Sequence, residues 1–165
     1  MSPKLRILLV LVGIVLPLDQ LTKLLIERYV SPYEPITVID GFFRITHATN
    51  PGMAFGLLQH VHVGFFIVLT LVALGLIGSF YRSLARDDRF GSASLALILA
   101  GALGNLIDRV FRESGVVDFL QFDLGLFIFP DFNVADSAIV IGVGLLLFEL
   151  VVSETEEAAG QEGES

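Results

Sequence analysis

The chain contains no cysteine. Disulfides, cysteine–zinc sites and a thiol nucleophile are therefore excluded, although the absence leaves the cellular compartment open. The sequence also has no basic patch that would bind nucleic acid. The formal net charge at pH 7 is −8, but it says little about partners. Much of this charge lies in residues 153–165, which are rich in glutamate, poor in apolar residues and without a base. We predict that this segment is a disordered acidic tail.

Hydrophobic residues, by contrast, make up 54% of the chain and form four long runs. The runs cover residues 7–26, 63–81, 92–110 and 134–152. A membrane-spanning helix needs about 20 mostly apolar residues. Lys4 and Arg6 precede the first run like the start of a secretory signal, but no small-x-small cleavage site follows, so we interpret this run as a retained span. The sequence therefore predicts one polytopic membrane domain, residues 1–152, with four spans and no internal repeat.

The arginines and lysines indicate how the spans are oriented. The loop between the second and third runs contains Arg82, Arg86 and Arg89, and Lys4 and Arg6 precede the first run. Cytoplasmic loops carry an excess of such residues. We therefore expect both termini and this loop to be cytoplasmic and residues 27–60 and 111–133 to lie outside. The bias is modest, because the outer side holds basic residues too, namely Arg28, Arg44, Arg109 and Arg112.

Polar residues interrupt the apolar runs almost entirely at one edge of the membrane. Because consecutive spans run in opposite directions, seven of them meet at the outer edge: Asp19, Lys23, Asn105, Asp108, Arg109, Asn133 and Asp136. Ionisable groups within a bilayer are costly and usually mark a functional site. Their convergence at one depth predicts an active site at the outer membrane surface.

The two outer segments are expected to form a small sheet. Residues 36–46 are two β-prone runs around Asp40-Gly41, a strong hairpin signal. Residues 116–122 and 126–129 are also strand-like. Between them in the chain, Asn50-Pro51-Gly52 predicts a turn, and the short apolar piece 53–58 should lie along the membrane interface.

Asp118 and Asp136 are the pair with the clearest chemistry. Asp118 lies between Val117 and Phe119 in a predicted strand, and Asp136 lies in the first turn of the fourth span. Two carboxyl groups in one low-dielectric site do not both ionise, so they share a proton. The ionised group can activate water, and the protonated group can hydrogen-bond a carbonyl oxygen. Such a pair is typical of an aspartic peptidase.

Each residue also has a plainer interpretation. Asp136 and Asn133 could simply cap the fourth span, and Asp118 could face lipid headgroups. Two further pairs, Asp108 with Arg109 and Asp19 with Lys23, could be structural ion pairs. His60 and His62 could bind a metal, but no third ligand is evident, so we expect none.

Five stretches of the chain resemble one known family. They occur in that family's order and spacing: Asp19-Gln-Leu-Thr-Lys23, Asn50-Pro-Gly-Met-Ala-Phe-Gly56, Gly104-Asn-Leu-Ile-Asp-Arg109, Val116-Val-Asp-Phe119 and Phe132-Asn-Val-Ala-Asp136. On these residues the chain resembles the lipoprotein signal peptidases, or signal peptidases II, of the bacterial cytoplasmic membrane. Met53 is a departure, since alanine is common there, and the acidic tail matches no family motif.

The resemblance implies a largely helical membrane fold with a small β element: four transmembrane helices, an extracytoplasmic β-cradle and a short interfacial helix. It implies an aspartic endopeptidase without a cofactor, with Asp118 and Asp136 as the catalytic dyad. Its substrates would be diacylglyceryl-modified prolipoproteins, cut just before the lipidated cysteine, in contact with membrane lipids. We expect a monomer whose dyad the peptide antibiotic globomycin would occupy. The expected binding or supporting residues are Asn50, Gly52, Asn105, Arg109 and Asn133, with Asp19, Lys23 and Asp108.

Two other classes of protein stay open at this point. In a small proton-coupled carrier or channel, Asp19, Asp108 and Asp136 would relay protons. That class accounts for carboxylates inside the membrane but not for the outer segments or for Asp118 in a strand. A non-enzymatic assembly factor is the third possibility, and cleavage of a lipidated substrate by the purified protein would separate all three.

Overall fold

The structure is a computed structural model that describes residues 1–51 and 62–162, those after Val152 as backbone only. Gly52, Met53, His60 and the predicted interfacial piece 53–58 lie outside the described residues.

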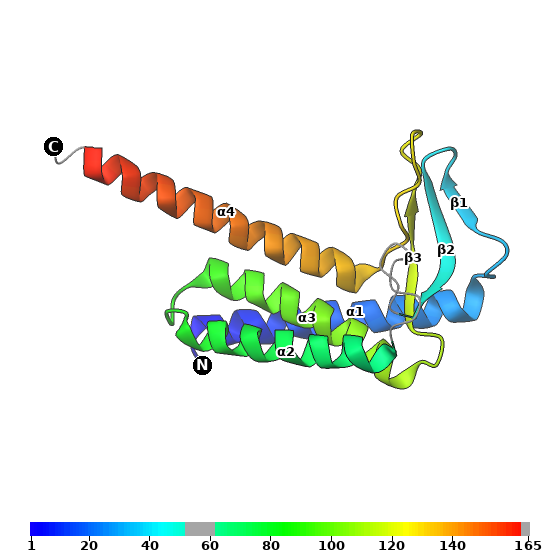
Figure 1. The fold of residues 1–165 in the computed structure, drawn as a ribbon, viewed down its shortest axis with the longest axis horizontal. Coiled ribbons are helices and arrows are strands. Elements are labelled where there is room, and N and C mark those ends of the chain that lie inside the picture. Colours follow the sequence, from blue (N-terminus) through cyan, green and yellow to red (C-terminus); the bar gives the residue numbers. More distant parts are fainter. Residues whose placement is uncertain (52–61, 163–165) are drawn as a thin grey trace.

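Four helices form the body of the described protein. They are α1 (Pro3–Tyr29), α2 (Val63–Ser83), α3 (Arg89–Phe111) and α4 (Val134–Glu162). Each contains a stretch that is long and apolar enough to cross a membrane. The four predicted spans are thus confirmed to within a few residues. In Figure 1, α1, α2 and α3 run side by side, whereas α4 leans away from them toward its C-terminal end.

Helix α3 is the central helix of the bundle. It contributes most of the buried helical residues, while none of the residues of α2 is buried. Small residues allow helices to approach closely in a membrane: a Cβ at Gly104 would lie 2.5 Å from Asp19 Oδ2, and one at Gly101 would collide with the carbonyl of Ala135. The close contacts of α3 with α1 and α4 therefore depend on these glycines, and large apolar side chains on the outer faces are left to face lipid.

A three-stranded antiparallel sheet lies at one end of the bundle. Its strands are β1 (Ile36–Ile39), β2 (Phe43–Asn50) and β3 (Val116–Phe122), in the order β1-β2-β3. The predicted hairpin is confirmed: Phe42 N donates to Ile39 O at 3.1 Å, and Gly41 has φ +67°. Both predicted outer segments contribute to this one sheet.

The run 126–129, which we expected to be strand-like, is not a strand. Only an isolated bridge joins Asp123 to Ile128. The chain turns sharply at Gly125, where φ is +79°, and Pro130 has no N–H to continue a strand pairing. The segment is consequently a tight apolar loop beyond the end of β3.

The sheet is fixed to the outer end of α1 by a small apolar core. Ile26 of α1 and Val30, which caps that helix, pack against Val117 and Phe119 of β3, all of them buried. This core holds β3 beside the end of α3 and the start of α4 (Figure 1).

The acidic tail differs from the prediction over most of its length. We predicted disorder for residues 153–165, but the backbone continues the α4 helix to Glu162. Glutamate, alanine and glutamine are good helix formers, and no proline interrupts the segment, so the helix is extended.

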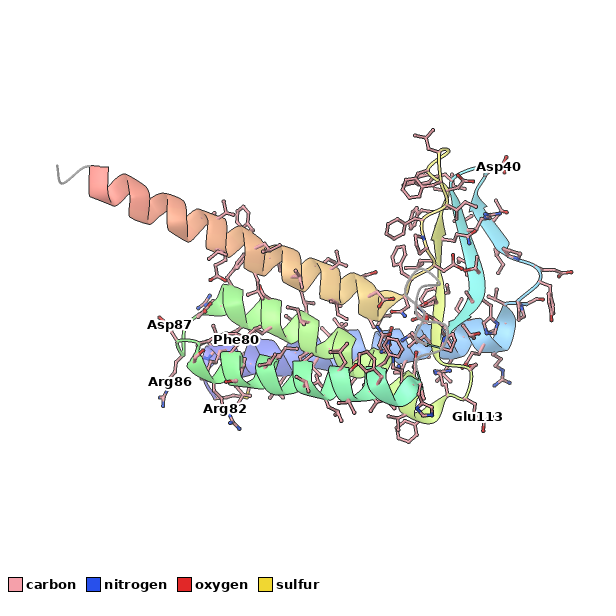
Figure 2. All side chains as sticks on the ribbon, in the orientation of Figure 1. Asp40, Phe80, Arg82, Arg86, Asp87 and Glu113 are labelled. Atoms are coloured by element: carbon pink, nitrogen blue, oxygen red, sulfur yellow. The ribbon has the colours of Figure 1, made fainter. Side chains whose placement is uncertain are left out.

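The two ends of the bundle differ in the residues they present. Figure 2 shows Asp40 and Glu113 at the end that carries the sheet and Arg82 and Arg86 at the opposite end. The start of α1 and the end of α4 lie on the same side as this arginine-rich loop, away from the sheet (Figure 1). The sheet and the arginine-rich loop are therefore on opposite sides of the predicted membrane.

Candidate active site at the junction of helices and sheet

Asp118 is held inside the protein by strand β3. Its flanking residues Val117 and Phe119 belong to the apolar core, and Asp118 itself is only 4% exposed. Asn133 Nδ2 donates to Asp118 Oδ1 at 2.7 Å, and the Asn50 side chain also hydrogen-bonds the carboxyl group. Asp118 is therefore not a residue that faces lipid headgroups.

Asp136 lies in the first turn of α4 and has two kinds of partner. Asn133 N donates to Asp136 Oδ2 at 3.3 Å, while Asn133 Oδ1 accepts from Asp136 N at 2.9 Å. This reciprocal arrangement is a helix cap, so the plainer interpretation is geometrically right. The other carboxylate oxygen, however, accepts from Asn105 Nδ2 at 2.7 Å. Asp136 therefore caps its helix and takes part in the polar cluster at the same time.

Two asparagines connect the two carboxyl groups. Asn133 contacts both Asp118 and Asp136, and Asn105 contacts Asp136. The asparagines also bond each other, since Asn133 Nδ2 lies 3.2 Å from Asn105 Oδ1. Both side chains are buried, which fixes their rotamers. The carboxyl groups of β3 and α4 are thus joined through a rigid amide bridge.

The surroundings of Asp118 favour its protonated form. Burial raises the pKa of Asp118 to about 7, and the negative charge of Asp136 acts in the same direction. Hydrogen bonds from Asn133 and Asn50 and the positive charge of Lys23 oppose this rise in pKa. Asp118 therefore carries a proton for much of the time near neutral pH.

Arg109 places a positive charge near the carboxyl groups of Asp118 and Asp136. It interacts electrostatically with both Asp136 and Asp118. One guanidinium nitrogen donates to Asn105 O at 3.3 Å, and the group lies 5.9 Å from the ring centroid of Phe66. Its buried Nε has no hydrogen-bond partner among the described residues. The guanidinium therefore retains a donor for a further acceptor.

A fully buried ionic cluster lies behind the asparagines. Lys23 Nζ lies 2.9 Å from Asp19 Oδ2 and 2.7 Å from Asp108 Oδ2, and none of the three side chains is exposed. The structural pair of Asp19 with Lys23 is confirmed. The pair of Asp108 with Arg109 is not found, because Asp108 binds Lys23 and, at 3.0 Å, Arg112 Nε instead.

Two residues of this region, Gln20 and Gly115, were not among those predicted from the sequence. Gln20 Nε2 donates to Asp19 Oδ2, Asp108 Oδ1 and the carbonyl of Gly104. An amide inside an apolar run is itself costly, and that signal could have identified it. Gly115, with φ +90°, also went unnoticed; a Cβ there would lie 2.5 Å from the carbonyl oxygen of Asn50.

Asp136 lines two cavities. One, of about 320 Å³, lies among α2, α3 and α4 and is bounded on its polar side by Asn105, Arg109 and Asp136. The other, of about 480 Å³, is almost wholly apolar and lies between the loop at Phe129–Phe132 and α4. The carboxyl group of Asp136 is therefore accessible although most of the polar cluster is buried.

The predicted site residues have the following places. The structure brings together Asn50, Asn105, Arg109, Asp118, Asn133 and Asp136. Asp19, Lys23 and Asp108 form the ionic cluster behind them, and Gly52 is outside the described residues. His62, considered as a metal ligand, caps α2 by accepting from Gly64 N at 3.0 Å.

Fold and site together define a polytopic membrane protein with a polar, carboxylate-containing cluster where four helices meet a small sheet. Comparison with known proteins identifies its family. The family model described as signal peptidase (SPase) II matches residues 11–152. The chain is 46% identical over 160 residues to a lipoprotein signal peptidase of Geobacter sulfurreducens, covering 96% of this chain and 99% of that protein. It is 44% identical over 135 residues to a lipoprotein signal peptidase of Bacillus pumilus, covering 82% and 86% of the two chains.

Solved structures agree with this result. A bacterial membrane enzyme determined by the in meso method at 2.3 Å resolution matches with a TM-score of 0.83 at 34% identity, covering 90% of each chain. A second, at 1.9 Å, matches with a TM-score of 0.79 at 35% identity, covering 87% of this chain and 91% of the other. The chain belongs to the signal peptidase II family, the lipoprotein signal peptidases. It is accordingly a multi-pass bacterial membrane protease that acts on lipoprotein signal peptides.

Proposed function

We propose that this chain is an aspartic endopeptidase that cleaves diacylglyceryl-modified prolipoproteins just before the lipidated cysteine, with Asp118 and Asp136 as its catalytic dyad. One observation carries the proposal. Two carboxyl groups from different elements, β3 and α4, are linked by the same asparagine, and one of them lines a cavity. The role of a helix cap would account for Asp136, but it would not account for a second carboxyl group, that of Asp118, buried beside the same asparagine.

The two carboxyl groups would divide the chemistry between them. The ionised carboxylate accepts a proton from water as the water oxygen attacks the scissile carbonyl carbon. The protonated carboxyl donates a hydrogen bond to the carbonyl oxygen and stabilises its developing negative charge. When the tetrahedral intermediate collapses, the C–N bond breaks and the leaving amine takes up the proton. The pKa of about 7 for Asp118 supports a dyad that holds a single proton near neutral pH.

Substrate binding would use the donors that surround the dyad. Arg109 has an unused buried N–H and lines the same cavity as Asp136, so it can bind a substrate carbonyl. The Asn50 side chain contacts Asp118 at the start of the segment that includes Gly52, so both residues are proposed to contact the extended peptide. Because the substrate is itself a membrane helix with acyl chains, it would enter laterally, through the cavity among α2, α3 and α4.

The remaining assignments follow from the same proposal. The protein would act as a monomer in the bacterial cytoplasmic membrane, with its active site on the outer face, in contact with membrane lipids. Globomycin would inhibit it by occupying the dyad. We also propose residues 1–152 as the peptidase domain, with the segment after residue 152 outside it.

The structure provides an argument against a proton-coupled carrier. A relay carboxylate must gain and lose a proton during transport. Asp19 and Asp108 are instead both bound to one buried ammonium group, that of Lys23, at 2.9 and 2.7 Å. Both carboxylates are thus part of a buried ion-pair cluster whose contacts would have to break in a relay, so these two groups are poor candidates for one.

Isosteric substitution of the dyad tests the proposal. Asp118→Asn and Asp136→Asn should each leave a folded, membrane-inserted protein, because asparagine is nearly isosteric with aspartate and keeps one side-chain oxygen as an acceptor. Each should lower cleavage of a purified lipidated preprolipoprotein, measured by gel shift, by about four orders of magnitude or more, and the double variant should be no worse. Chelators should have no effect. Normal cleavage by Asp136→Asn would leave Asp136 as a helix cap only and refute the aspartic mechanism.

A further inference from the structure

Lys23 is the residue of the buried ionic cluster that contacts both of its carboxylates, those of Asp19 and Asp108. Its ammonium group lies within 3.1 Å of three acceptors, Asp19 Oδ2, Asp108 Oδ2 and Asn105 Oδ1. The side chain is fully buried, which is costly for a lysine and is tolerated because all three protons of the ammonium group are used. In the mechanism above it has no part.

The first of these partners, Asp19, hydrogen-bonds the helix that carries Asp136. Asp19 binds Lys23 through Oδ2, and its other oxygen, Oδ1, accepts from Ala135 N at 2.9 Å. Ala135 directly precedes Asp136. The start of α4 is therefore bound to α1 at the peptide next to one carboxyl group of the dyad.

The second partner, Asp108, hydrogen-bonds the strand that carries Asp118. Asp108 Oδ2, the oxygen bound to Lys23, also accepts from Val117 N at 3.4 Å. Val117 directly precedes Asp118. Two carboxylates on one ammonium group thus hold the peptide N–H immediately before each member of the dyad, on two separate elements.

The third partner orients the amide bridge. An ammonium group is only a donor, so Asn105 must turn its Oδ1 toward Lys23. The Nδ2 group of Asn105 is then directed to Asp136 Oδ1, at 2.7 Å. Without the lysine, the amide could turn over and present its oxygen to the carboxylate instead.

We propose that Lys23 is a positioning residue of the active site, which sets the relative placement of Asp118 and Asp136 through Asp19, Asp108 and Asn105. This inference rests on the proposed function of the dyad. An ion pair that only joined two helices would not need these contacts. Each partner of Lys23 is hydrogen-bonded either to Asp136 itself or to the residue that precedes Asp118 or Asp136.

Lys23 also acts on the dyad by its charge. Its positive charge lowers the pKa of Asp118, against the effects of burial and of Asp136. Arg109, on α3, also interacts electrostatically with Asp118. Loss of Lys23 should therefore disturb both the geometry and the titration of the dyad.

The test compares three variants of the full chain. Lys23→Met removes the ammonium group but leaves two buried aspartates without a partner, so it can fail to fold. Asp19→Asn/Lys23→Met/Asp108→Asn removes all three charges and keeps side-chain oxygens for Ala135 N and Val117 N. Arg28→Met is the matched control, because it removes a cation from the exposed side of the same helix.

Three properties of each variant are measured in detergent or bicelles. They are the thermal unfolding midpoint, kcat and KM for a lipidated preprolipoprotein, and the titration of 13C-labelled aspartate carboxyl groups, with Asp118 and Asp136 assigned from their asparagine variants. Two close carboxyl groups titrate in two coupled steps, so the separation of the steps reports their placement without reference to activity. A wild-type protein that does not cleave would refute the proposed function, while the titration would still test the role of Lys23.

We expect the triple variant to unfold close to the wild-type temperature. Its kcat should fall by about tenfold to a hundredfold, because a small misplacement of reacting groups has an effect of this size. KM should change little, the two titration steps should move closer together, and Arg28→Met should match the wild type throughout. A folded triple variant with wild-type kcat and titration would overturn the proposal. So would a triple variant that does not fold, because Lys23 would then serve to hold the helices together.

Discussion

At the scale of single residues, the two carboxyl groups of the dyad have different surroundings. Asp118 is buried in a strand between two core residues, whereas Asp136 is partly exposed and lines two cavities. Asn133 contacts both of them. In the proposed mechanism, the burial of Asp118 would set the pH at which the pair loses its proton, and the exposure of Asp136 would set where a substrate approaches.

The pH dependence of cleavage follows from this difference. The pKa of Asp118 is raised to about 7, so above that pH both carboxyl groups become ionised and no proton is left for the scissile carbonyl. At low pH both are protonated and no base remains. We expect kcat/KM to fall on both sides of an optimum, with the alkaline limb beginning near pH 7. A rate that stays level well above pH 7, measured with the lipidated precursor, would show that Asp118 does not supply that proton.

Arg109 should support the reaction without taking part in proton transfer. It lines the cavity next to Asp136 and has a free buried donor. Loss of one preorganised donor costs about a hundredfold in kcat, which we expect for Arg109→Ala. Arg109→Lys should lose less, because it keeps the charge but not the planar fork. Full turnover by Arg109→Ala in a steady-state assay would mean that Arg109 only anchors α3 at the interface.

At the scale of secondary structure elements, the β1–β2 hairpin and helix α3 show two different uses of glycine. Gly41 adopts φ +67° with open space around it, so its requirement is conformational. Gly101 and Gly104 have ordinary helical geometry, and their requirement is contact with α4 and α1. Only the conformational requirement for glycine can be predicted from the local sequence.

Substitution at Gly41 tests the conformational requirement. Gly41→Val should destabilise the protein by about 1–3 kcal/mol, because a β-branched residue resists positive φ. Asparagine tolerates this conformation, so Gly41→Asn is the matched control and should cost much less. Thermal unfolding of both variants in the same detergent measures the difference. Equal stability of the two would show that the turn does not require a left-handed residue.

At the scale of the whole molecule, the sheet and the arginine-rich loop lie at opposite ends of the four helices. Figure 2 shows Asp40 and Glu113 at one end and Arg82, Arg86 and Asp87 at the other. The start of α1 and the end of α4 also lie away from the sheet (Figure 1). The loop at the end away from the sheet contains Arg82, Arg86 and Arg89 within eight residues, and by the positive-inside rule we propose that this end is cytoplasmic and that the sheet end is the outer face.

Single-cysteine labelling checks this topology, and the chain suits it because it has no native cysteine. A cysteine at the exposed position Ser83 should react with a membrane-impermeant reagent only after the cytoplasmic side is opened. A cysteine at Glu113, which is exposed at the sheet end, serves as the control and should react from outside in intact cells. Labelling of Ser83→Cys from outside would reverse the proposed orientation.

The amino-acid sequence by itself determined the parts of this protein that depend on local chemistry. Apolar runs long enough to cross a bilayer predict helices because the membrane leaves the backbone few other options. The Asp40-Gly41 turn predicts the hairpin because few residue pairs adopt its conformation. The polar residues could be placed at one depth because consecutive spans alternate in direction. The family motifs then assigned Asp118 and Asp136 their expected roles.

Only the tertiary structure decided which polar residues are partners. Nothing in the sequence indicates that Asp108 binds Lys23 and not its neighbour Arg109, because that choice depends on how α1 packs against α3. Likewise, 126–129 has the composition of a strand, but it folds back tightly onto the end of β3, where Phe129 N donates to Phe122 O at 2.8 Å, and Pro130 then interrupts further pairing. The connection from Lys23 through Asp19 to Ala135 joins residues far apart in the chain. Such contacts depend on packing between elements, and packing is not encoded in the local sequence of any one of them.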